Sequence, residues 1–303
     1  MKNDRKGTAL QHLMTRIDAA LERAVGAGEA QGCPPTLALA IRHAVFPGGA
    51  RIRPQLSVAV ALACGDDTPA LTDAVAASIE LLHCASLVHD DLPAFDDAPT
   101  RRGLPTVHRL HGERIAILAG DALIVRAFQT LATGAALAPG RLAPILDTIS
   151  RGVGMPFGIV AGQAWECEPQ VELTEYQRAK TGSLFAAATM AGAQAAGSDP
   201  EPWRAFGDWL GEAYQVADDI RDAAADPEMI GKPTGRDVAL GRPSMARELG
   251  VREAIRRFDR LVEGTAAAIP ACTGAAQLRS LVRIESERLV PKAWARRIDR
   301  IAA

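Results

Sequence analysis

Long Ala- and Leu-rich segments with apolar residues at helical spacing limit the fold of this sequence more than any other feature. In Leu71–His89, apolar side chains recur at three- and four-residue steps. Segments 115–131, 203–216 and 251–269 show similar spacing, and strand-type alternation is almost absent. Glycine and proline clusters separate these segments, but no low-complexity linker or repeat divides the chain. We therefore predict an all-α protein, with residues 1–303 forming a single large helical bundle as one domain.

Charge and cysteine content argue against several classes of protein. The net charge at pH 7 is −2, so the basic excess of a nucleic-acid-binding protein is missing. The 5 cysteines are scattered without a CxxC pair, which favours neither a disulfide framework nor a zinc site and fits a reducing cytoplasm. The N-terminus is polar, unlike a secretory signal, and the longest apolar runs fall short of the roughly 20 residues of a membrane span. We expect a cytoplasmic protein without a membrane span.

A first cluster of acids, which includes Asp90, Asp91 and Asp96, directly follows a strongly apolar segment. Pro93 disfavours helical geometry at the residue before it, so Asp90 and Asp91 are expected in the last turn of a helix. The helix dipole disfavours acids at this end. The position therefore carries an electrostatic penalty that the sequence itself does not relieve.

A second cluster contains Asp218, Asp219 and Asp222. Asp218 and Asp222 are four residues apart, so like charges project from one helical face and repel each other. Solvated surface acids are the ordinary interpretation of any such pair. Bound cations, however, would relieve the penalties in both clusters, and oxygen-only ligands without a nearby cysteine suit Mg²⁺. The two clusters together predict a magnesium site.

Cations beside glycine turns alternate with the acid clusters along the chain. They occur in Gly48–Arg53, Arg101–Gly103, Lys180–Gly182 and Lys232–Arg236. Guanidinium groups bind phosphate bidentately and lysine supplies a point charge, so this layout suits diphosphates, although the P-loop pattern is absent. His83 lies seven residues before Asp90, two turns away on the same face, within reach of a bound phosphate.

Taken in chain order, these segments resemble the motifs of the trans-polyprenyl diphosphate synthases. The segments that carry the likeness are Gly48–Pro54, Asp90–Asp96, Arg101–Gly103, Gly162–Gln163, Lys180–Gly182 and Gln215–Asp222. Asp90–Asp96 resembles the first aspartate-rich motif in its spaced form, and Gln215–Asp222 resembles the second. The stretch His83–Asp91 and the variant Gly49-Ala50-Arg51 are most similar to bacterial geranylgeranyl diphosphate synthases of carotenoid and bacteriochlorophyll pathways.

The resemblance implies a helical bundle of the class I isoprenoid synthase type, a homodimer and three Mg²⁺ ions in each active site. The metal ligands it implies are Asp90, Asp96 and Asp218, with direct or water-mediated support from Asp91, Asp219 and Asp222. For the substrates it implies Arg101, Lys180 and Lys232 on the allylic diphosphate, and Arg53, His83 and Arg102 on isopentenyl diphosphate. Thr181 and Gln215 would line the allylic carbon and steady the cation.

The sequence departs from the family pattern at a few positions. Ala50 stands where a lysine is usual, which removes one expected contact to isopentenyl diphosphate. Glu166 replaces an aspartate after the Gly-Gln pair, and Arg221 replaces an apolar residue. None of these changes removes an expected metal ligand.

The reaction expected from this resemblance is the condensation of isopentenyl diphosphate with dimethylallyl, geranyl or farnesyl diphosphate. Ala85 and Ser86 lie five and four residues before Asp90, and two small residues there leave an apolar tunnel open. We therefore expect a twenty-carbon product, geranylgeranyl diphosphate, unless these residues are only close helix-packing positions. The alternatives are a farnesyl diphosphate synthase, a terpene cyclase, which the second aspartate cluster disfavours, and a non-catalytic partner subunit.

Overall fold

Helices dominate the computed structural model, which describes residues 2–170, 172–224 and 250–291. Within these ranges the strand content is a single antiparallel pair, in which β1 (Thr100–Arg101) pairs with β2 (Leu104–Pro105). The predicted all-α fold is therefore confirmed.

The chain divides into two compact units. Unit 1 comprises residues 1–149 and 190–200, and unit 2 comprises residues 150–189 and 201–303. Helix α10 (Ser183–Ala195) contributes residues to both units. The organisation of the whole chain as one domain stays a prediction.

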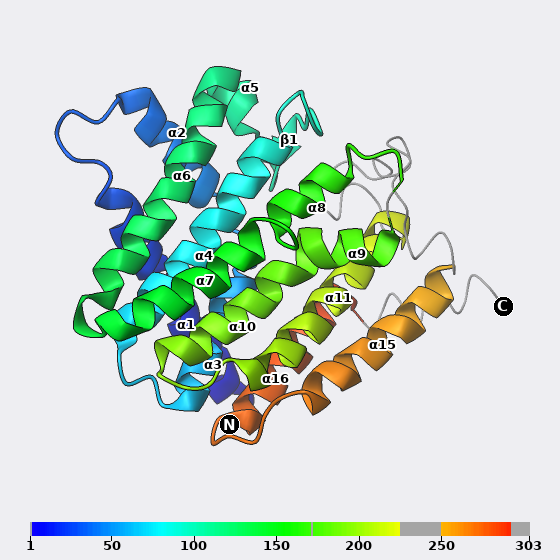
Figure 1. The fold of residues 1–303 in the computed structure, drawn as a ribbon. Helices are drawn as coiled ribbons and strands as arrows, with labels where there is room; N and C mark the ends of the chain where they lie inside the picture. The colour runs from blue at the N-terminus through cyan, green and yellow to red at the C-terminus, as the bar shows by residue number, and fades with distance from the viewer. Residues whose placement is uncertain (1, 171, 225–249, 292–303) are drawn as a thin grey trace. The chain divides into compact units, whose positions relative to one another are not determined.

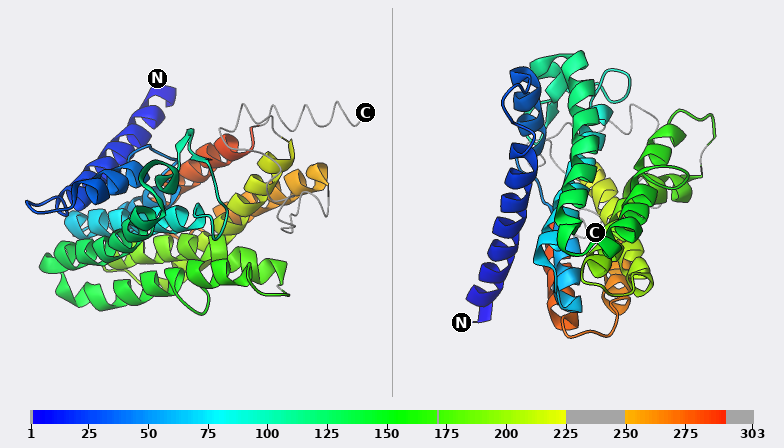
Figure 2. Two further views of the ribbon diagram at one scale, coloured as in Figure 1. Left: turned by 90° about the horizontal axis from the view of Figure 1, so that it is seen from above. Right: turned by 60° about the vertical axis from the view of Figure 1, so that its left-hand side comes forward.

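Unit 1 is built around helix α4 (Figure 1). Its elements, in order, are α1 (Lys2–Gly26), α2 (Pro35–Val45), α3 (Ile52–Cys64), α4 (Pro69–Asp90), the β1–β2 pair, α5 (Val107–His111), α6 (Glu113–Gly134), η1 (Ala135–Leu137), η2 (Pro139–Arg141) and the first part of α7 (Leu142–Val153). Helix α4 contacts α1, α3 and α6, and α1 lies along the edge of the unit (Figure 2). The segment predicted as helical from apolar spacing is thus the core helix of this unit.

Helix α4 is buried on nearly all sides because it is apolar on nearly all sides. Val75, Ile79 and Leu82 are each at most 1% exposed. Each such side chain stabilises the fold by about 1.5–3 kcal/mol relative to full exposure. The helix begins with Pro69 in its first turn and ends at Asp90, as the position of Pro93 predicted.

The regular secondary structure that is described in unit 2 is also entirely helical. It contains the end of α7, α8 (Ile159–Trp165), α9 (Leu173–Gln177), the π turn η3 (Arg178–Gly182), the first part of α10, α11 (Glu201–Ala224), α15 (Val251–Ala267) and α16 (Ala275–Leu289). Helix α15 runs beside α11 (Figure 1) and buries Ala254, Phe258 and Leu261, which recur at helical spacing. The helix predicted for segment 251–269 is confirmed within two residues at each end. The helix predicted for segment 203–216 is also confirmed, but it extends further and ends at Ala224.

Two of the described helices have the length and apolar composition that could cross a membrane. In α4, 78% of the apolar window is buried inside the protein, as in the core helix of a globular domain. In the segment Glu113–Leu137 only 33% is buried. The absence of a membrane span therefore stays a prediction, and the exposed side of α6 needs its own explanation.

Candidate active site

The first acid cluster lies in a tight turn that begins where α4 ends. The backbone N–H of Asp96 donates to the carbonyl oxygen of Asp90 at 2.9 Å, and that of Ala98 donates to the carbonyl of Asp91 at 3.1 Å. These bonds fold the chain back, so that Asp96 returns to the side of Asp90 despite the five residues between them. Two predicted metal ligands are therefore held together by the backbone.

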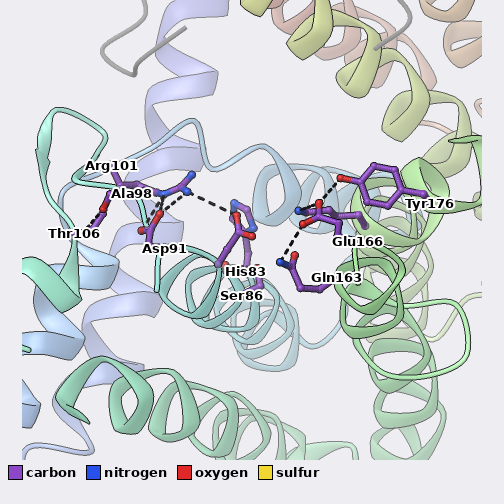
Figure 3. A network of polar contacts seen from close by, with 11 residues as sticks. His83, Ser86, Asp91, Ala98, Arg101, Thr106, Gln163, Glu166 and Tyr176 are labelled. Carbon is purple, nitrogen blue, oxygen red and sulfur yellow. Dashed lines mark hydrogen bonds and ion pairs between the residues drawn. The ribbon is translucent and has the colours of Figure 1, made fainter. Parts of the chain in front are cut away.

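Asp91 has a different environment from its neighbours. Its side chain is 5% exposed and accepts three hydrogen bonds from Arg101 (Figure 3). Nε donates to Oδ1 at 2.8 Å and to Oδ2 at 3.1 Å, and Nη2 donates to Oδ1 at 2.6 Å. Burial raises the pKa of Asp91, and the guanidinium of Arg101 opposes that rise. Arg101 Nη2 also lies 3.8 Å from Asp90 Oδ2. Asp91 therefore holds Arg101 next to Asp90, which suits the supporting role predicted for Asp91.

His89 fixes this end of α4 against α6. Its Nε2 lies 3.2 Å from the carbonyl oxygen of Ile117. A Cβ on Gly120 would lie 2.1 Å from the same ring nitrogen, so only glycine leaves room for the imidazole. The residue directly before Asp90 is thereby locked in place, a role that the sequence alone did not reveal.

Arg53 and His83, both predicted to bind isopentenyl diphosphate, come together in unit 1. Arg53 Nη1 lies 3.4 Å from His83 Nε2. Desolvation and the positive charge of Arg53 and Arg102 lower the pKa of His83 well below its ordinary value. His83 is therefore neutral at pH 7 and offers a hydrogen bond to an anion without adding charge.

Glu80 interacts with two arginines of unit 1, Arg51 and Arg102. Its Oε1 accepts from Arg51 Nη1 at 2.5 Å, and both side chains are 2% exposed. Arg102 Nη2 lies 4.0 Å from the same oxygen. The guanidinium of Arg102 covers Gly49, where a Cβ would lie 2.8 Å from Cζ. Arg51 therefore points inward, and Arg102 is the cation beside the turn in which Ala50 replaces the usual lysine.

Glu80 was missed by sequence reasoning. The signal that could have found it is an acid in the middle of the apolar segment of α4, ten residues before Asp90. A small pocket of unit 1 has Asp91, Arg101 and Arg102 among its lining residues, next to Cys84. Burial raises the pKa of the Cys84 thiol to about 12, so this cysteine is not a nucleophile at neutral pH.

In unit 2, Lys180 lies in the π turn and is held by Glu166. Glu166 Oε1 accepts hydrogen bonds from both Lys180 Nζ and the hydroxyl of Tyr176 (Figure 3). Gln163 Nε2 donates to Glu166 Oε2 at 3.4 Å. The glutamate that replaces the usual aspartate therefore organises the lysine predicted to bind the allylic diphosphate.

The second acid cluster is connected to the π turn through Gln215. The hydroxyl of Thr181 donates to Gln215 Oε1 at 2.8 Å, and Gln215 Nε2 donates to Asp219 Oδ1 at 3.1 Å. Asp218 accepts a hydrogen bond from Arg221 at 2.9 Å. Thr181 and Gln215, which are both predicted to line the allylic carbon, therefore lie within hydrogen-bond distance of each other.

The side chains of two predicted site residues lie outside the described residues. Asp222 lies in helix α11, but its side chain is outside the described residues. Lys232 lies in segment 225–249, also outside them. The roles of Asp222 as a metal ligand and of Lys232 as a diphosphate contact therefore stay predictions from the sequence.

The carboxylates of both clusters fit magnesium by their chemistry. Within the described ranges, no three His, Cys, Asp or Glu side chains converge on a pre-formed metal cluster. Mg²⁺ in phosphate-handling sites is usually held by one or two carboxylates and completed by substrate oxygens and water. The pairing of Asp90 with Asp96 by the backbone matches that requirement.

Known proteins share both the sequence and the fold. The family described as polyprenyl synthetase matches residues 34–266. The chain is 53% identical to the geranylgeranyl diphosphate synthase of Cereibacter sphaeroides over 283 residues, covering 93% of this chain and 98% of that protein. It is 47% identical to the geranylgeranyl diphosphate synthase of Rhodobacter capsulatus over 275 residues, covering 91% and 95%. Among solved structures, a geranyltransferase from Helicobacter pylori complexed with magnesium and isoprenyl diphosphate has a TM-score of 0.76 at 29% identity, covering 90% of this chain and 97% of that chain.

The all-α fold and the paired acid and arginine sites define an enzyme that transfers prenyl groups. The chain belongs to the polyprenyl synthetase family, as its motifs predicted. The family match spans both acid clusters and every cation predicted to bind a diphosphate.

Proposed function

We propose that this enzyme is a magnesium-dependent geranylgeranyl diphosphate synthase. It joins isopentenyl diphosphate to dimethylallyl, geranyl and farnesyl diphosphates in turn, adding five carbons each time. The observation that carries the proposal is the 53% identity over nearly the full length of a relative named for this product. The small residues Ala85 and Ser86 before the first acid cluster support it.

In this proposal the two acid clusters hold three Mg²⁺ ions. Asp90, Asp96 and Asp218 are the ligands, supported by Asp91, Asp219 and Asp222. When bound, the ions neutralise the diphosphate so that it can leave the allylic carbon with the bonding electrons. Arg101, fixed beside Asp90 by Asp91, binds the same diphosphate, and Lys180 and Lys232 add further positive charge.

The remaining residues act on the carbon skeleton and on the second substrate. The hydroxyl of Thr181 and the amide of Gln215 line the allylic carbon and steady its developing positive charge. Arg53, His83 and Arg102 hold isopentenyl diphosphate. Its double bond attacks the cation, and the proton lost afterwards goes to the departing diphosphate, so no side chain serves as general base.

Product length is proposed to depend on Ser86 and Ala85, which differ in burial. Ser86 is half-buried, and its hydroxyl bonds back to the carbonyl oxygen of His83 at 2.8 Å (Figure 3). Ala85 is 1% exposed and already packed within unit 1. Because Ser86 shares a helical face with Asp90, a Ser86→Phe substitution should shorten the product towards fifteen carbons. Ala85→Phe should also shorten it, with a stability cost from overpacking. An unchanged product length in both variants would show that other residues close the end of the apolar tunnel.

We further propose a homodimer, as the family resemblance implied, in the cytoplasm, as the cysteine content indicated. Helix α6 exposes Ile117 (46%), Leu118 (51%) and Val125 (57%), an apolar surface that a second copy could cover. Val125→Asp should convert the dimer to a monomer in sedimentation velocity, while a wild-type protein that sediments as a monomer contradicts this part of the proposal. A place in a carotenoid pathway stays a prediction.

The function is tested by incubating the purified protein with isopentenyl and dimethylallyl diphosphates and sizing the product. We expect mainly twenty-carbon diphosphate, no turnover after chelation with EDTA, and recovery with Mg²⁺. Mainly fifteen-carbon product would identify a farnesyl diphosphate synthase, and a cyclic hydrocarbon a terpene cyclase. No turnover, with activity appearing only on mixing with another subunit, would identify a non-catalytic partner.

A further inference from the structure

The π turn η3 presents two predicted active-site residues of unit 2. It comprises Arg178–Gly182, between α9 and α10, and carries Lys180 and Thr181. A π turn widens the helix by one residue and is uncommon, and such turns are frequent at functional sites. Because it is less regular than an α-helix, its position depends on what packs against it.

Two glycines on neighbouring helices, Gly162 and Gly211, pack closely against the backbone of this turn. A Cβ on Gly162 of α8 would lie 2.3 Å from the backbone nitrogen of Lys180. A Cβ on Gly211 of α11 would lie 2.7 Å from the Cα of Gly182. Real Cβ atoms essentially never come so close to backbone atoms, so α8 and α11 reach the turn only because both positions lack a side chain.

The Gly211 contact and the Thr181–Gln215 hydrogen bond join the same two elements. Gly211 and Gln215 are one turn apart on α11, and Gly182 is next to Thr181 in the π turn. The distance between α11 and the π turn therefore fixes the hydrogen bond from Thr181 Oγ1 to Gln215 Oε1, which is 2.8 Å. A methyl group at position 211 would force the two backbones apart and stretch that bond.

We propose that Gly211 is a positioning residue for catalysis. It sets the distance between the π turn and α11. It thereby keeps the hydroxyl of Thr181 hydrogen-bonded to the side-chain amide of Gln215. The inference rests on the proposed function, in which these two groups steady the allylic cation. Displacing them reduces the turnover number of condensation, and it leaves the binding of isopentenyl diphosphate unchanged because Arg53, His83 and Arg102 belong to unit 1.

Gly207 provides a matched control one turn earlier on the same face of α11. A Cβ there would lie 2.5 Å from the Cα of Ala186, in α10 beyond the π turn. Gly207→Ala therefore introduces the same methyl group into the same kind of helix contact. Its strain falls on α10 and not on the turn that carries Lys180 and Thr181.

The test compares Gly211→Ala, Gly207→Ala, Thr181→Ala and the double variant Gly211→Ala/Thr181→Ala. Melting temperature, kcat and the KM of each substrate are measured for every protein. We expect both glycine variants to lower the melting temperature. Gly211→Ala should reduce kcat by about 10- to 100-fold, because a displacement on the order of 1 Å has effects of this size, with the KM for isopentenyl diphosphate unchanged. Gly207→Ala should keep kcat within about threefold, and the double variant should be no slower than Thr181→Ala because both changes disrupt one interaction.

Three outcomes would overturn the inference: a Gly211→Ala enzyme with wild-type kcat, an equal loss of kcat in Gly207→Ala, or losses that multiply in the double variant. If Gly211→Ala does not fold, Gly162→Ala, which meets the same turn from α8, takes its place in every comparison. A wild-type kcat in Gly162→Ala then counts against the role of the turn. Failure of the wild-type enzyme to make any prenyl product would instead refute the proposed function.

Discussion

The two acid clusters serve one predicted purpose but are held in different ways. In unit 1, Asp90 and Asp96 are joined by a backbone hydrogen bond, and the neighbouring Asp91 is clamped by Arg101 from strand β1. In unit 2, Asp218 and Asp219 are bound by side chains one turn away on their own helix. The first cluster is therefore set by the fold of a turn and a distant arginine, whereas the described hydrogen bonds of the second come from its own helix, with Gln215 bonded in turn to Thr181 of the π turn.

The largest effect should come from removing one metal ligand in either unit. We expect Asp90→Ala and Asp218→Ala each to reduce kcat about 1,000-fold, because each loses several kcal/mol of charge stabilisation of the leaving diphosphate. Steady-state rates at saturating Mg²⁺ measure this. A variant of either cluster that keeps more than a tenth of the wild-type rate would show that only the other cluster holds the metals.

Next in size is the clamp on Asp91. Arg101→Ala leaves a buried carboxylate without its bidentate partner, a change that costs about 3–5 kcal/mol. We expect a lower melting temperature together with a raised KM for the allylic substrate. Arg101→Lys should recover part of both losses, since it restores charge without the bidentate geometry. An unchanged allylic KM in Arg101→Ala would limit Arg101 to a structural role.

A substitution of Glu80 tests whether a buried acid positions Arg51 and Arg102 in unit 1. Glu80→Gln removes the negative charge that pairs with Arg51 and Arg102, so the two guanidinium groups lose the partner that holds them in position. We therefore expect the KM for isopentenyl diphosphate to rise by about tenfold, or 1.4 kcal/mol. Glu285→Gln is the matched control, because Glu285 is also buried and pairs with Arg288 at 2.7 Å on α16. Equal KM values in the two variants would assign Glu80 to stability alone.

The smallest effect is expected at Arg221, the partner of Asp218. This pair is three residues apart on one helix and partly exposed, so it contributes at most about 0.5 kcal/mol. Arg221→Ala should therefore change the Mg²⁺ concentration for half-maximal activity by less than about threefold. A much larger change would mean that the second cluster, like the first, depends on its arginine.

Sequence patterns predicted the features that depend on neighbouring residues. The end of α4 at Asp90 follows from Pro93, and the buried helix before it follows from apolar spacing. The four-residue spacing of Asp218 and Asp222 predicted a helix there, and the structure has both residues in α11. The order of the motifs then identified the family.

The features that escaped sequence reasoning depend on partners far away in the chain. The role of Glu80 depends on Arg102 and on Arg51, which is 29 residues away. The role of His89 depends on Gly120 and on the carbonyl of Ile117, which is 28 residues away. The π turn is one residue wider than an α-helix, and no apolar periodicity marks that difference. Contacts of this kind are set by packing, which a pattern in one segment does not encode.

The central claim is that both acid clusters bind one magnesium–diphosphate assembly. A crystal structure with Mg²⁺ and a non-cleavable allylic thiolodiphosphate tests it most directly. The account predicts divalent ions that contact the diphosphate together with Asp90, Asp96 and Asp218. Ions bound by only one cluster, or a diphosphate held by arginines with no divalent ion beside it, would contradict the account.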